Sequence, residues 1–474
     1  MLWTLFSLSA LASTTPSAPT HSVHMLHTLN PLEVRLDAPP PVPSKGVHSA
    51  TVYGYLQGNA STVSLVDLDS LTHVAWHAVG WDSSGNITNT SSWAAVAPTL
   101  VTSAHAVGTR VHLNLMPDDE THAAVLSNPT RRANAVAQLA ELINDYDADG
   151  ISIDIEGMSS SLKAELVLFT QEMQDAVDEV IVATPLKDWN GAYDYDELAA
   201  ASDGLFIMGY DAHGPWDDSG PGPISMMEDG ALWPEWTLPY SLNEEYRAWG
   251  ATDDKLIMGL PLYGGVWNTP SDDYPAITYS FHNHWSYSTL LDNVPVLGRR
   301  FEEVSVSAWM WDDDALRQIW YDDAETLEVK MAWALDEGIQ GIGFWEVSYA
   351  TGEPDFWELV DDLTMVEEEE EEEDTGSPED TGTPSDEDGT GSDGGTGGDD
   401  AGDDSGGETS AGEEDGASTT SGETEPSDGL EDNEIADTGG ESTEKGCSCS
   451  ATPNPQGAVW LFAGVLGLLS RRRD

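Results

Sequence analysis

The sequence predicts an α/β fold in which eight parallel strands alternate with helices and close into a (β/α)8 TIM barrel. Apolar runs recur from about Val47 to Leu363, and helix-like stretches lie between them. Many of these runs are apolar at successive positions, which is typical of parallel strands covered on both faces. Eight such runs over roughly 310 residues fit a barrel. A doubly wound sheet is the alternative, but no Gly-rich phosphate loop follows the first run.

The expected strands are, in chain order, Ala50–Tyr55, Leu71–Val79, Arg110–Met116, Gly150–Ile155, Val180–Thr184, Gly204–Met208, Leu256–Leu262 and Gly341–Trp345. Helices are expected at Arg131–Asn144 and Ala324–Glu337, where apolar residues recur every three or four positions. The interval between the seventh and eighth strands is the longest. Residues Gly265–Gln318 are therefore predicted to form a small insertion over the barrel mouth.

The overall charge limits the possible partners. The 474 residues include 86 Asp and Glu but only 17 Lys and Arg, which gives a formal net charge of −69. Nucleic-acid binding is excluded because phosphates must be met by Lys and Arg. High net charge also keeps a protein soluble, and we expect a monomer. The two cysteines, Cys447 and Cys449, lie beyond the barrel, so neither a disulfide scaffold nor a cysteine zinc site is expected in it.

The N-terminal end predicts export. Residues 1–12 read MLWTLFSLSALA, an apolar run with small residues near its end, and are interpreted as a secretory signal peptide. Residues 13–46 are rich in Pro, Ser and Thr and are interpreted as a leader or linker, which places the start of the barrel domain, 47–363, at residue 47.

After the barrel, residues 364–446 are predicted to form a disordered acidic linker. Seven consecutive Glu residues, Glu367–Glu373, open its charged part, and Gly, Ser, Thr, Asp and Pro follow. A segment with so few apolar residues cannot bury a core, and its like charges repel one another. Calcium binding is the alternative to a plain spacer, but no calcium-loop pattern is present.

Residues 447–474 are predicted to be an anchoring tail. The apolar run Gly457–Ser470 is shorter than the roughly 20 residues that a helix usually needs to cross a membrane, but three arginines follow it, as in a stop signal. With Cys447 and Cys449 before it, the layout resembles the three-part sorting tails of some bacterial surface proteins. A buried C-terminal helix is the alternative. We therefore expect an exported protein, extracellular or held at the cell surface or outer envelope through this tail.

The segment Asp149–Glu156 (DGISIDIE) is the most informative for chemistry. Side chains alternate along a strand, so Ser152, Asp154 and Glu156 share one face, which points into the barrel. Two acids on a buried face repel each other, and one stays protonated near neutral pH, as a general acid must. The alternative is a pair of acids solvated at the strand end.

This segment resembles the DGxDxDxE signature of glycoside hydrolase family 18, the chitinase family. Three further segments match that family in order: Met208–Trp216 (MGYDAHGPW) resembles the motif of its sixth strand, Gly259–Gly264 (GLPLYG) that of its seventh, and Gly341–Glu346 (GIGFWE) that of its eighth. The resemblance covers about residues 47–363. It implies cleavage of β-linked N-acetylglucosamine polymers with retention, the substrate's acetamido group acting as the nucleophile.

The resemblance also implies a role for each matching residue. Glu156 would protonate the glycosidic oxygen and later activate water, and Asp154 would hold the acetamido N–H. Tyr210 would donate its hydroxyl to the acetamido oxygen, Asp211 would contact the sugar, and Trp345 would form the floor beneath the sugar ring. No metal or other cofactor is implied.

Further substrate contacts are expected from the motif residues Met208 and Tyr263. Among the 18 tryptophans, Trp216 and Trp267 are the preferred candidates for stacking on sugars, with core packing as the alternative. His213 is expected to orient a loop rather than to bind a metal.

The sequence departs from the family's pattern at Ser152, where the chitinases usually carry Asp. Family members that act on peptidoglycan or spore-wall glycans can have a neutral residue there. Gly265 also replaces an Arg that is often seen after the Tyr-Gly pair. The leading hypothesis is therefore a chitin-directed hydrolase. A peptidoglycan N-acetylglucosaminidase with the same mechanism, or a lectin that binds chitin-like oligosaccharides without turnover, are the alternatives.

Overall fold

The computed structural model describes residues 23–35 and 46–366, apart from 217–219, 231, 234–235 and 277–278. The predicted signal peptide, the acidic linker beyond residue 366 and the anchoring tail lie outside the described residues. Within these ranges, no helix has both the length and the apolar character needed to cross a membrane.

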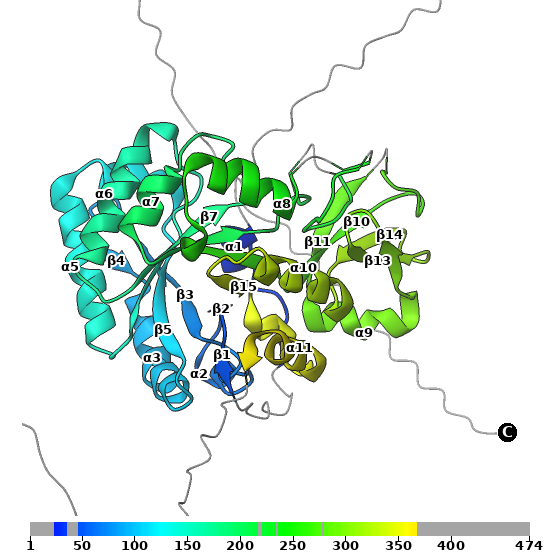
Figure 1. The fold of residues 1–474 in the computed structure, drawn as a ribbon, viewed down its shortest axis with the longest axis horizontal. Helices are drawn as coiled ribbons and strands as arrows, with labels where there is room; N and C mark the ends of the chain where they lie inside the picture. The colour runs from blue at the N-terminus through cyan, green and yellow to red at the C-terminus, as the bar shows by residue number, and fades with distance from the viewer. Residues whose placement is uncertain are drawn as a thin grey trace, which may run out of the picture. The chain divides into compact units, whose positions relative to one another are not determined.

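Eight parallel strands form a closed barrel, which confirms the predicted fold class (Figure 1). They are β2 (Thr51–Leu56), β3 (His73–Trp81), β5 (Arg110–Leu115), β6 (Gly150–Ile153), β7 (Val180–Pro185), β8 (Gly204–Met208), β9 (Leu256–Pro261) and β15 (Gly341–Trp345). Strand β15 pairs with β9 and β2, and β2 pairs with β3, so the ring has no open edge. The expected strands match to within two residues at each end, and β6 ends at Ile153, just before the two acids.

Aromatic rings fill the barrel interior. Phe206 of β8 lies edge-on to Tyr55, with ring centroids 5.0 Å apart. Its neighbours on β9 and β15 are glycines, because a Cβ at Gly259 would lie 2.4 Å from the Phe206 ring and a Cβ at Gly343 would lie 2.5 Å from it. The lower part of the bore is therefore packed solid, and chemistry is confined to the mouth.

Helices cover the outside of the barrel. They are α2 (Ala60–Val63), α3 (Thr90–His105), α4 (Asp119–Leu126), α5 (Pro129–Asn144), α6 (Lys163–Gln174), α7 (Tyr195–Ala201), α8 (Leu238–Tyr240), α10 (Ala324–Asp336) and α11 (Pro354–Thr364). Helix α5 begins where the Asn128 side chain accepts from two backbone N–H groups, and it buries Ala135, Leu139 and Ile143, which are four residues apart.

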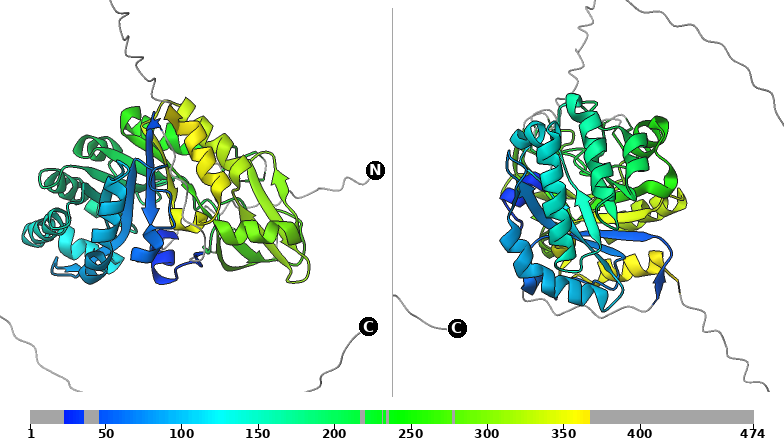
Figure 2. Two further views of the ribbon diagram at one scale, coloured as in Figure 1. Left: turned by 90° about the horizontal axis from the view of Figure 1, so that it is seen from below. Right: turned by 90° about the vertical axis from the view of Figure 1, so that its left-hand side faces the viewer.

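The segment between β9 and β15 is an insertion, as predicted. A five-stranded sheet orders as β11 (Ser280–Ser286), β10 (Tyr263–Asn268), β14 (Arg317–Tyr321), β13 (Ser307–Asp312) and β12 (Arg300–Glu302), with α9 (Tyr287–Leu297) packed on it. Figures 1 and 2 show this sheet beside the barrel. Its Trp267, Trp309 and Trp320 belong to the same hydrophobic core as the barrel.

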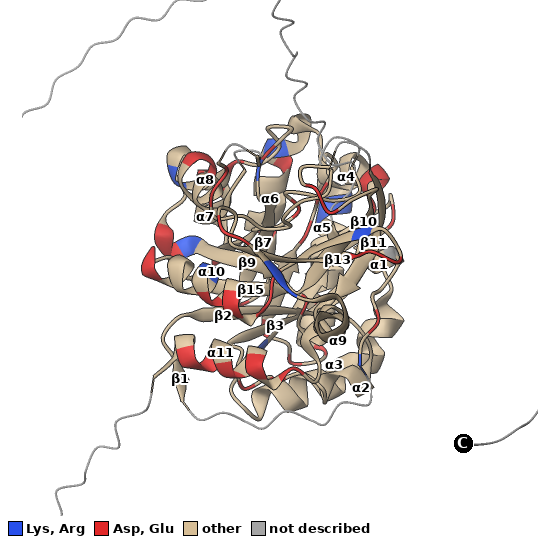
Figure 3. Cartoon of the chain, turned by 90° about the vertical axis from the view of Figure 1, so that its right-hand side faces the viewer, with Lys and Arg blue, Asp and Glu red and all other residues tan. Residues whose placement is uncertain are grey.

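Short elements complete the fold. Strand β4 (Ile87–Thr88) pairs with the end of β3, and β1 (Val47–His48) pairs with β16 (Met365–Val366) beneath the barrel. Acidic residues lie on several outer helices, α10 and α11 among them (Figure 3).

Part of the segment interpreted as a leader or linker belongs to the fold. Residues Val23–Leu29 form helix α1, which lies at the carboxyl ends of the barrel strands (Figure 1). Val23 and His24 are fully buried there. The sequence shows only one short stretch, VHMLHTL, with no strong helical pattern, so this placement depends on contacts with residues far away in the chain.

Candidate active site

The two carboxylates of the fourth strand stand at the mouth of the barrel. Asp154 follows β6 directly, and its backbone N–H donates to the Leu115 carbonyl at 2.9 Å, which extends the pairing with β5. Asp154 is fully buried, whereas Glu156 retains 8% exposure and lines an open cleft. The hydroxyl of Tyr193 donates to the Ile155 carbonyl at 2.9 Å and so fixes the backbone between the two acids.

Ser152 lies beneath Asp154 in a hydrogen-bonded cluster inside the barrel. Its hydroxyl lies 2.8 Å from the hydroxyl of Tyr55 and accepts from the Asn114 amide at 3.1 Å. All three side chains are buried. Position 152 is thus occupied by a neutral group whose hydroxyl is hydrogen-bonded on two sides.

The pKa of Asp154 lies below its ordinary value. Burial alone would raise the pKa, but the adjacent His24 ring, the nearby His77 and a hydrogen bond from Glu156 together lower it. The lowered pKa favours an ionised Asp154 beside Glu156, which lines the cleft.

The loop after β8 supplies three more groups. Met208 ends the strand and lines the cleft, and Tyr210 is fully buried, with its hydroxyl 2.6 Å from Nε2 of His24. Asp211 has a positive φ of 67°, which is uncommon for a residue other than Gly. The Tyr263 hydroxyl donates to Asp211 at 2.6 Å and holds its carboxylate at the cleft, and burial raises the pKa of Asp211.

Trp345 ends β15 and forms one wall of the same region. It is fully buried, and its indole N–H donates to Nδ1 of His27 at 3.0 Å. The next residue, Glu346, is also buried and accepts from the backbone N–H groups of Gln57 and Ser348 and from the Ser348 hydroxyl. Burial nevertheless raises the pKa of Glu346 to about 7.

One side of the site is an open cleft with about 770 Å³ of empty space. It is lined by Glu156, Met208, Tyr210 and Asp211 and, further out, by two tryptophans. Those two, Trp189 and Trp236, meet edge to face with ring centroids 4.3 Å apart. The cleft therefore offers exposed aromatic surface, suited to the C–H faces of sugars, next to the carboxylate of Glu156.

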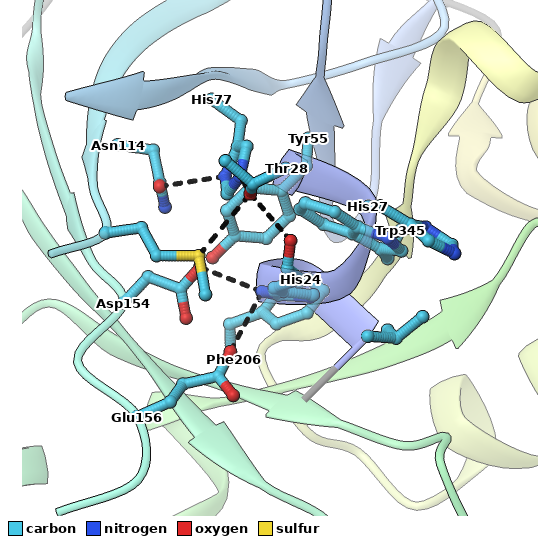
Figure 4. Close-up of polar contacts among 12 residues, drawn as sticks. His24, His27, Thr28, Tyr55, His77, Asn114, Asp154, Glu156, Phe206 and Trp345 are labelled. Atoms are coloured by element: carbon cyan, nitrogen blue, oxygen red, sulfur yellow. Dashed lines mark hydrogen bonds and ion pairs between the residues drawn. The ribbon is translucent and has the colours of Figure 1, made fainter. Parts of the chain in front are cut away.

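The other side of the site is occupied by α1 (Figure 4). The His24 ring stacks on Trp345 with centroids 3.6 Å apart and an interplanar angle of 21°. Its Nδ1 lies 2.8 Å from the Asp154 carboxylate, and its Nε2 lies 2.6 Å from the Tyr210 hydroxyl. Side chains from three strand ends thus converge on one small planar ring.

Residues 51–350 match the family model described as glycosyl hydrolases family 18. The chain belongs to this family. The match spans the whole barrel and the insertion, and every motif residue considered above lies within it.

Known family 18 relatives share modest identity with the chain. Di-N-acetylchitobiase of Mus musculus is 26% identical over 311 residues, covering 58% of this chain and 79% of the mouse protein. Chitinase C of Streptomyces lividans is 26% identical over 258 residues, covering 49% of this chain and 40% of that protein. Among solved structures, the family 18 chitinase of Cycas revoluta in complex with (GlcNAc)3 has the same fold, with a TM-score of 0.58 at 17% identity, and covers 66% of this chain and 99% of its own.

The structure brings most of the predicted family 18 site residues together at the mouth: Glu156, Asp154, Ser152, Met208, Tyr210, Asp211, Tyr263 and Trp345. Two predicted tryptophans lie elsewhere. Trp267 is fully buried in the insertion sheet against Phe281, which favours core packing, the alternative considered for it. Trp216 is half-buried beside Gly214 and is not among the residues that line the cleft. Nδ1 of His213 donates to the Pro223 carbonyl at 2.7 Å, in keeping with a loop-orienting role.

Sequence reasoning missed three contributors to the site. Trp189 follows β7, and the rule that barrel active sites gather at the carboxyl ends of strands could have singled it out. His77 lies in the middle of β3, with Nδ1 3.0 Å from the Asn114 amide oxygen, so that rule does not single it out. His24 carries no such signal, because it lies outside the barrel sequence.

Two clusters in the described chain have side chains of metal-ligand type. One, His24 with Asp154 and Glu156, is the hydrogen-bonded group at the mouth. The other, His73, His112 and Glu179, lies at the amino ends of the strands, where Arg110 also pairs with Glu179 at 2.9 Å. His112 hydrogen-bonds Glu179 at 2.9 Å, and Nε2 of His73 lies 3.2 Å from it. Burial would raise the pKa of Glu179, but these two histidines lower it, and the contacts account for this second arrangement.

Proposed function

We propose that the chain is a glycoside hydrolase that cleaves β-linked N-acetylglucosamine polymers of the chitin type, with retention, using the substrate's acetamido group as the nucleophile. One observation carries the proposal. The carboxylate of Asp154 and the hydroxyl of Tyr210 converge on a single small planar group stacked on Trp345, and Glu156 stands beside them at the open cleft.

In this proposal a sugar ring packs its C–H face on Trp345. The ionised Asp154 accepts the acetamido N–H, and Tyr210 donates its hydroxyl to the acetamido oxygen. These two contacts hold the acetamido oxygen for attack on the anomeric carbon, and they stabilise the positive charge that develops on the five-membered ring.

Glu156 gives its proton to the glycosidic oxygen as the bond to the leaving sugar breaks. The leaving sugar lies along the open cleft, toward Trp189 and Trp236. Glu156, now ionised, then takes a proton from water as the water attacks the anomeric carbon from the side of the departed sugar. Two displacements at one carbon return the original configuration.

The test is release of a chromophore from N-acetylglucosamine oligosaccharides by the wild type and by Glu156→Gln. The substitution keeps the shape of the side chain but removes the transferable proton, so turnover should fall by at least about 100-fold while oligosaccharide binding remains. Equal turnover by the two proteins would show that Glu156 is not the acid. Binding without turnover in the wild type, after the site has been opened as described below, would instead support a lectin.

Ser152 favours a second candidate substrate, the glycan of peptidoglycan. The neutral Ser152, held by Tyr55 and Asn114, cannot share a proton with Asp154 as a carboxylate would. Comparison of turnover on chitin and on purified peptidoglycan, with the same protein and the same reducing-end assay, decides between the two substrates.

We also propose that the protein is exported and displayed at the cell surface or outer envelope. Support comes from the sequence alone: the apolar residues 1–12, the acidic stretch 364–446 and the tail 447–474 with its two cysteines and three terminal arginines. Fractionation of cells that produce the full chain, with and without residues 447–474, tests the role of the tail.

A further inference from the structure

Helix α1 lies where the proposed mechanism needs the substrate. Val23 and His24 are fully buried and His27 nearly so, although the segment precedes the barrel and is linked to it only through residues 36–45. In Figure 4 the side chain of His24 extends from α1 toward Asp154 and Trp345, that of His27 lies beside Trp345, and that of Thr28 lies beside His77.

The ring of His24 takes the partners that the mechanism assigns to the acetamido group. An ionised carboxylate only accepts hydrogen bonds, so Nδ1 of His24 carries a proton toward Asp154. In a neutral ring, Nε2 then accepts the Tyr210 hydroxyl proton, as the acetamido oxygen would. The imidazole is a planar five-membered ring, like the ring formed when the acetamido oxygen attacks the anomeric carbon.

Other atoms of α1 engage the rest of the same subsite. The backbone N–H of Val23 donates to Asp211 at 3.0 Å, and Nδ1 of His27 accepts from the indole N–H of Trp345 at 3.0 Å. Because the His24 ring covers the face of Trp345 at 3.6 Å, a sugar cannot stack on that face at the same time.

The residues after α1 hold it in place from outside the subsite. Arg35 pairs with Glu353 at 2.9 Å and with Asp292 at 2.7 Å. These pairs are partly exposed, so each contributes little. A seven-residue helix is also too short to be stable alone. Helix α1 is therefore stable only while it contacts the barrel. A competing ligand, or a cut in the chain after the helix, can displace it.

We propose that residues 23–35 form an autoinhibitory plug that imitates the acetamido group of the sugar and competes with the substrate for the subsite on Trp345. The proposal rests on the proposed function for the identity of the ligand. The plug covers this subsite only, and the cleft toward Trp189 and Trp236 remains open.

The first test compares the full-length wild type with His24→Ala and with Glu33→Ala, a control at an exposed position of the same segment. His24→Ala removes two hydrogen bonds and the stacking contact without touching the barrel. Its KM for N-acetylglucosamine oligosaccharides should fall on the order of 10- to 100-fold while kcat stays the same, because a competing group lowers only the fraction of open sites. Glu33→Ala should behave as the wild type.

The second test cuts the folded full chain at a protease site inserted within residues 36–45 and washes the released segment away. Oligosaccharide affinity, measured by calorimetry, should rise as it does for His24→Ala. A synthetic peptide of residues 23–35 added back should bind the cut chain and restore inhibition, whereas the peptide with His24→Ala should not.

The outcomes separate this proposal from the proposed function. If the variant and the cut chain bind oligosaccharide more tightly but never hydrolyse it, the plug stands and the hydrolase fails. If the wild type, His24→Ala and the cut chain hydrolyse oligosaccharide with equal KM, the hydrolase stands and the plug is overturned. A lower kcat in His24→Ala would also overturn it, because His24 would then assist the reaction. If no form binds oligosaccharide, the peptides still decide. Binding of the wild-type peptide, but not of the His24→Ala peptide, to the cut chain supports the plug, and failure of the wild-type peptide to bind overturns it.

Discussion

Replacing Glu346 by Gln should change how the stability of the protein depends on pH. Glu346 is fully buried next to Trp345, and burial raises its pKa from the usual 4.5 to about 7. In the folded state it therefore holds its proton over a range in which the unfolded chain has lost it. The stabilising contribution is complete below pH 4.5 and is lost as pH rises through 7. The difference between 4.5 and about 7, at about 1.4 kcal/mol for each pH unit, corresponds to about 3.5 kcal/mol in full.

The measurement is the free energy of unfolding in urea at pH 5 and at pH 8, for the wild type and Glu346→Gln. The amide is neutral at both pH values and can still accept from Gln57 and Ser348. Because pH 5 lies just above the unfolded pKa of 4.5, the wild type should lose about 2.5 kcal/mol more than the variant between the two pH values. Glu358→Gln, at an exposed position of α11, is the control and should follow the wild type closely. An equal loss in the wild type and Glu346→Gln would refute the assignment of a buried, protonated Glu346.

Three further predictions concern the core and the site. Lys330 pairs with Asp322 at 2.5 Å, and both side chains are buried. Lys330→Ala should therefore lower the free energy of unfolding by about 3–5 kcal/mol, and the double variant Lys330→Met with Asp322→Leu should recover most of that loss. A loss below about 1 kcal/mol in Lys330→Ala would contradict this prediction. Trp345→Leu should raise KM for N-acetylglucosamine oligosaccharides on the order of tenfold once the plug is removed, and an unchanged KM would show that sugars do not stack there. Ser152→Asp places a second carboxylate beneath Asp154, so the acidic limb of the profile of kcat/KM against pH should move to higher pH; an unmoved limb would argue against coupling between the two positions.

Most of the barrel could be predicted from the sequence because its strands are short, continuous apolar runs with sharp ends. Gly204–Met208 and Gly341–Trp345 were located to the residue, since polar or turn residues flank both. The end of β6 was placed two residues too late, because Asp154 and Ile155 continue the alternation although the ladder stops at Ile153. The insertion was predicted from interval length alone, which says nothing of its five-stranded sheet.

The site was predicted where one strand end or one motif carries the information, as at Asp154, Tyr210 and Trp345. It was missed where partners come from distant parts of the chain. His24 lies 130 residues before Asp154, in a stretch whose composition is that of a linker. Trp267 shows the opposite problem, because an aromatic residue next to a strand end gives no sign of whether its ring faces a cleft or, as here, the core.

The configuration of the first product distinguishes catalysis through the acetamido group from direct attack by water. The cut chain or His24→Ala would be mixed with an N-acetylglucosamine oligosaccharide, and the anomeric protons of the product would be followed by NMR from the first minutes. The account predicts that the β-anomer appears first and converts slowly to the α-anomer by mutarotation. If the α-anomer appears first, water attacks the sugar directly, and the roles given to Asp154, Tyr210 and the acetamido group are wrong.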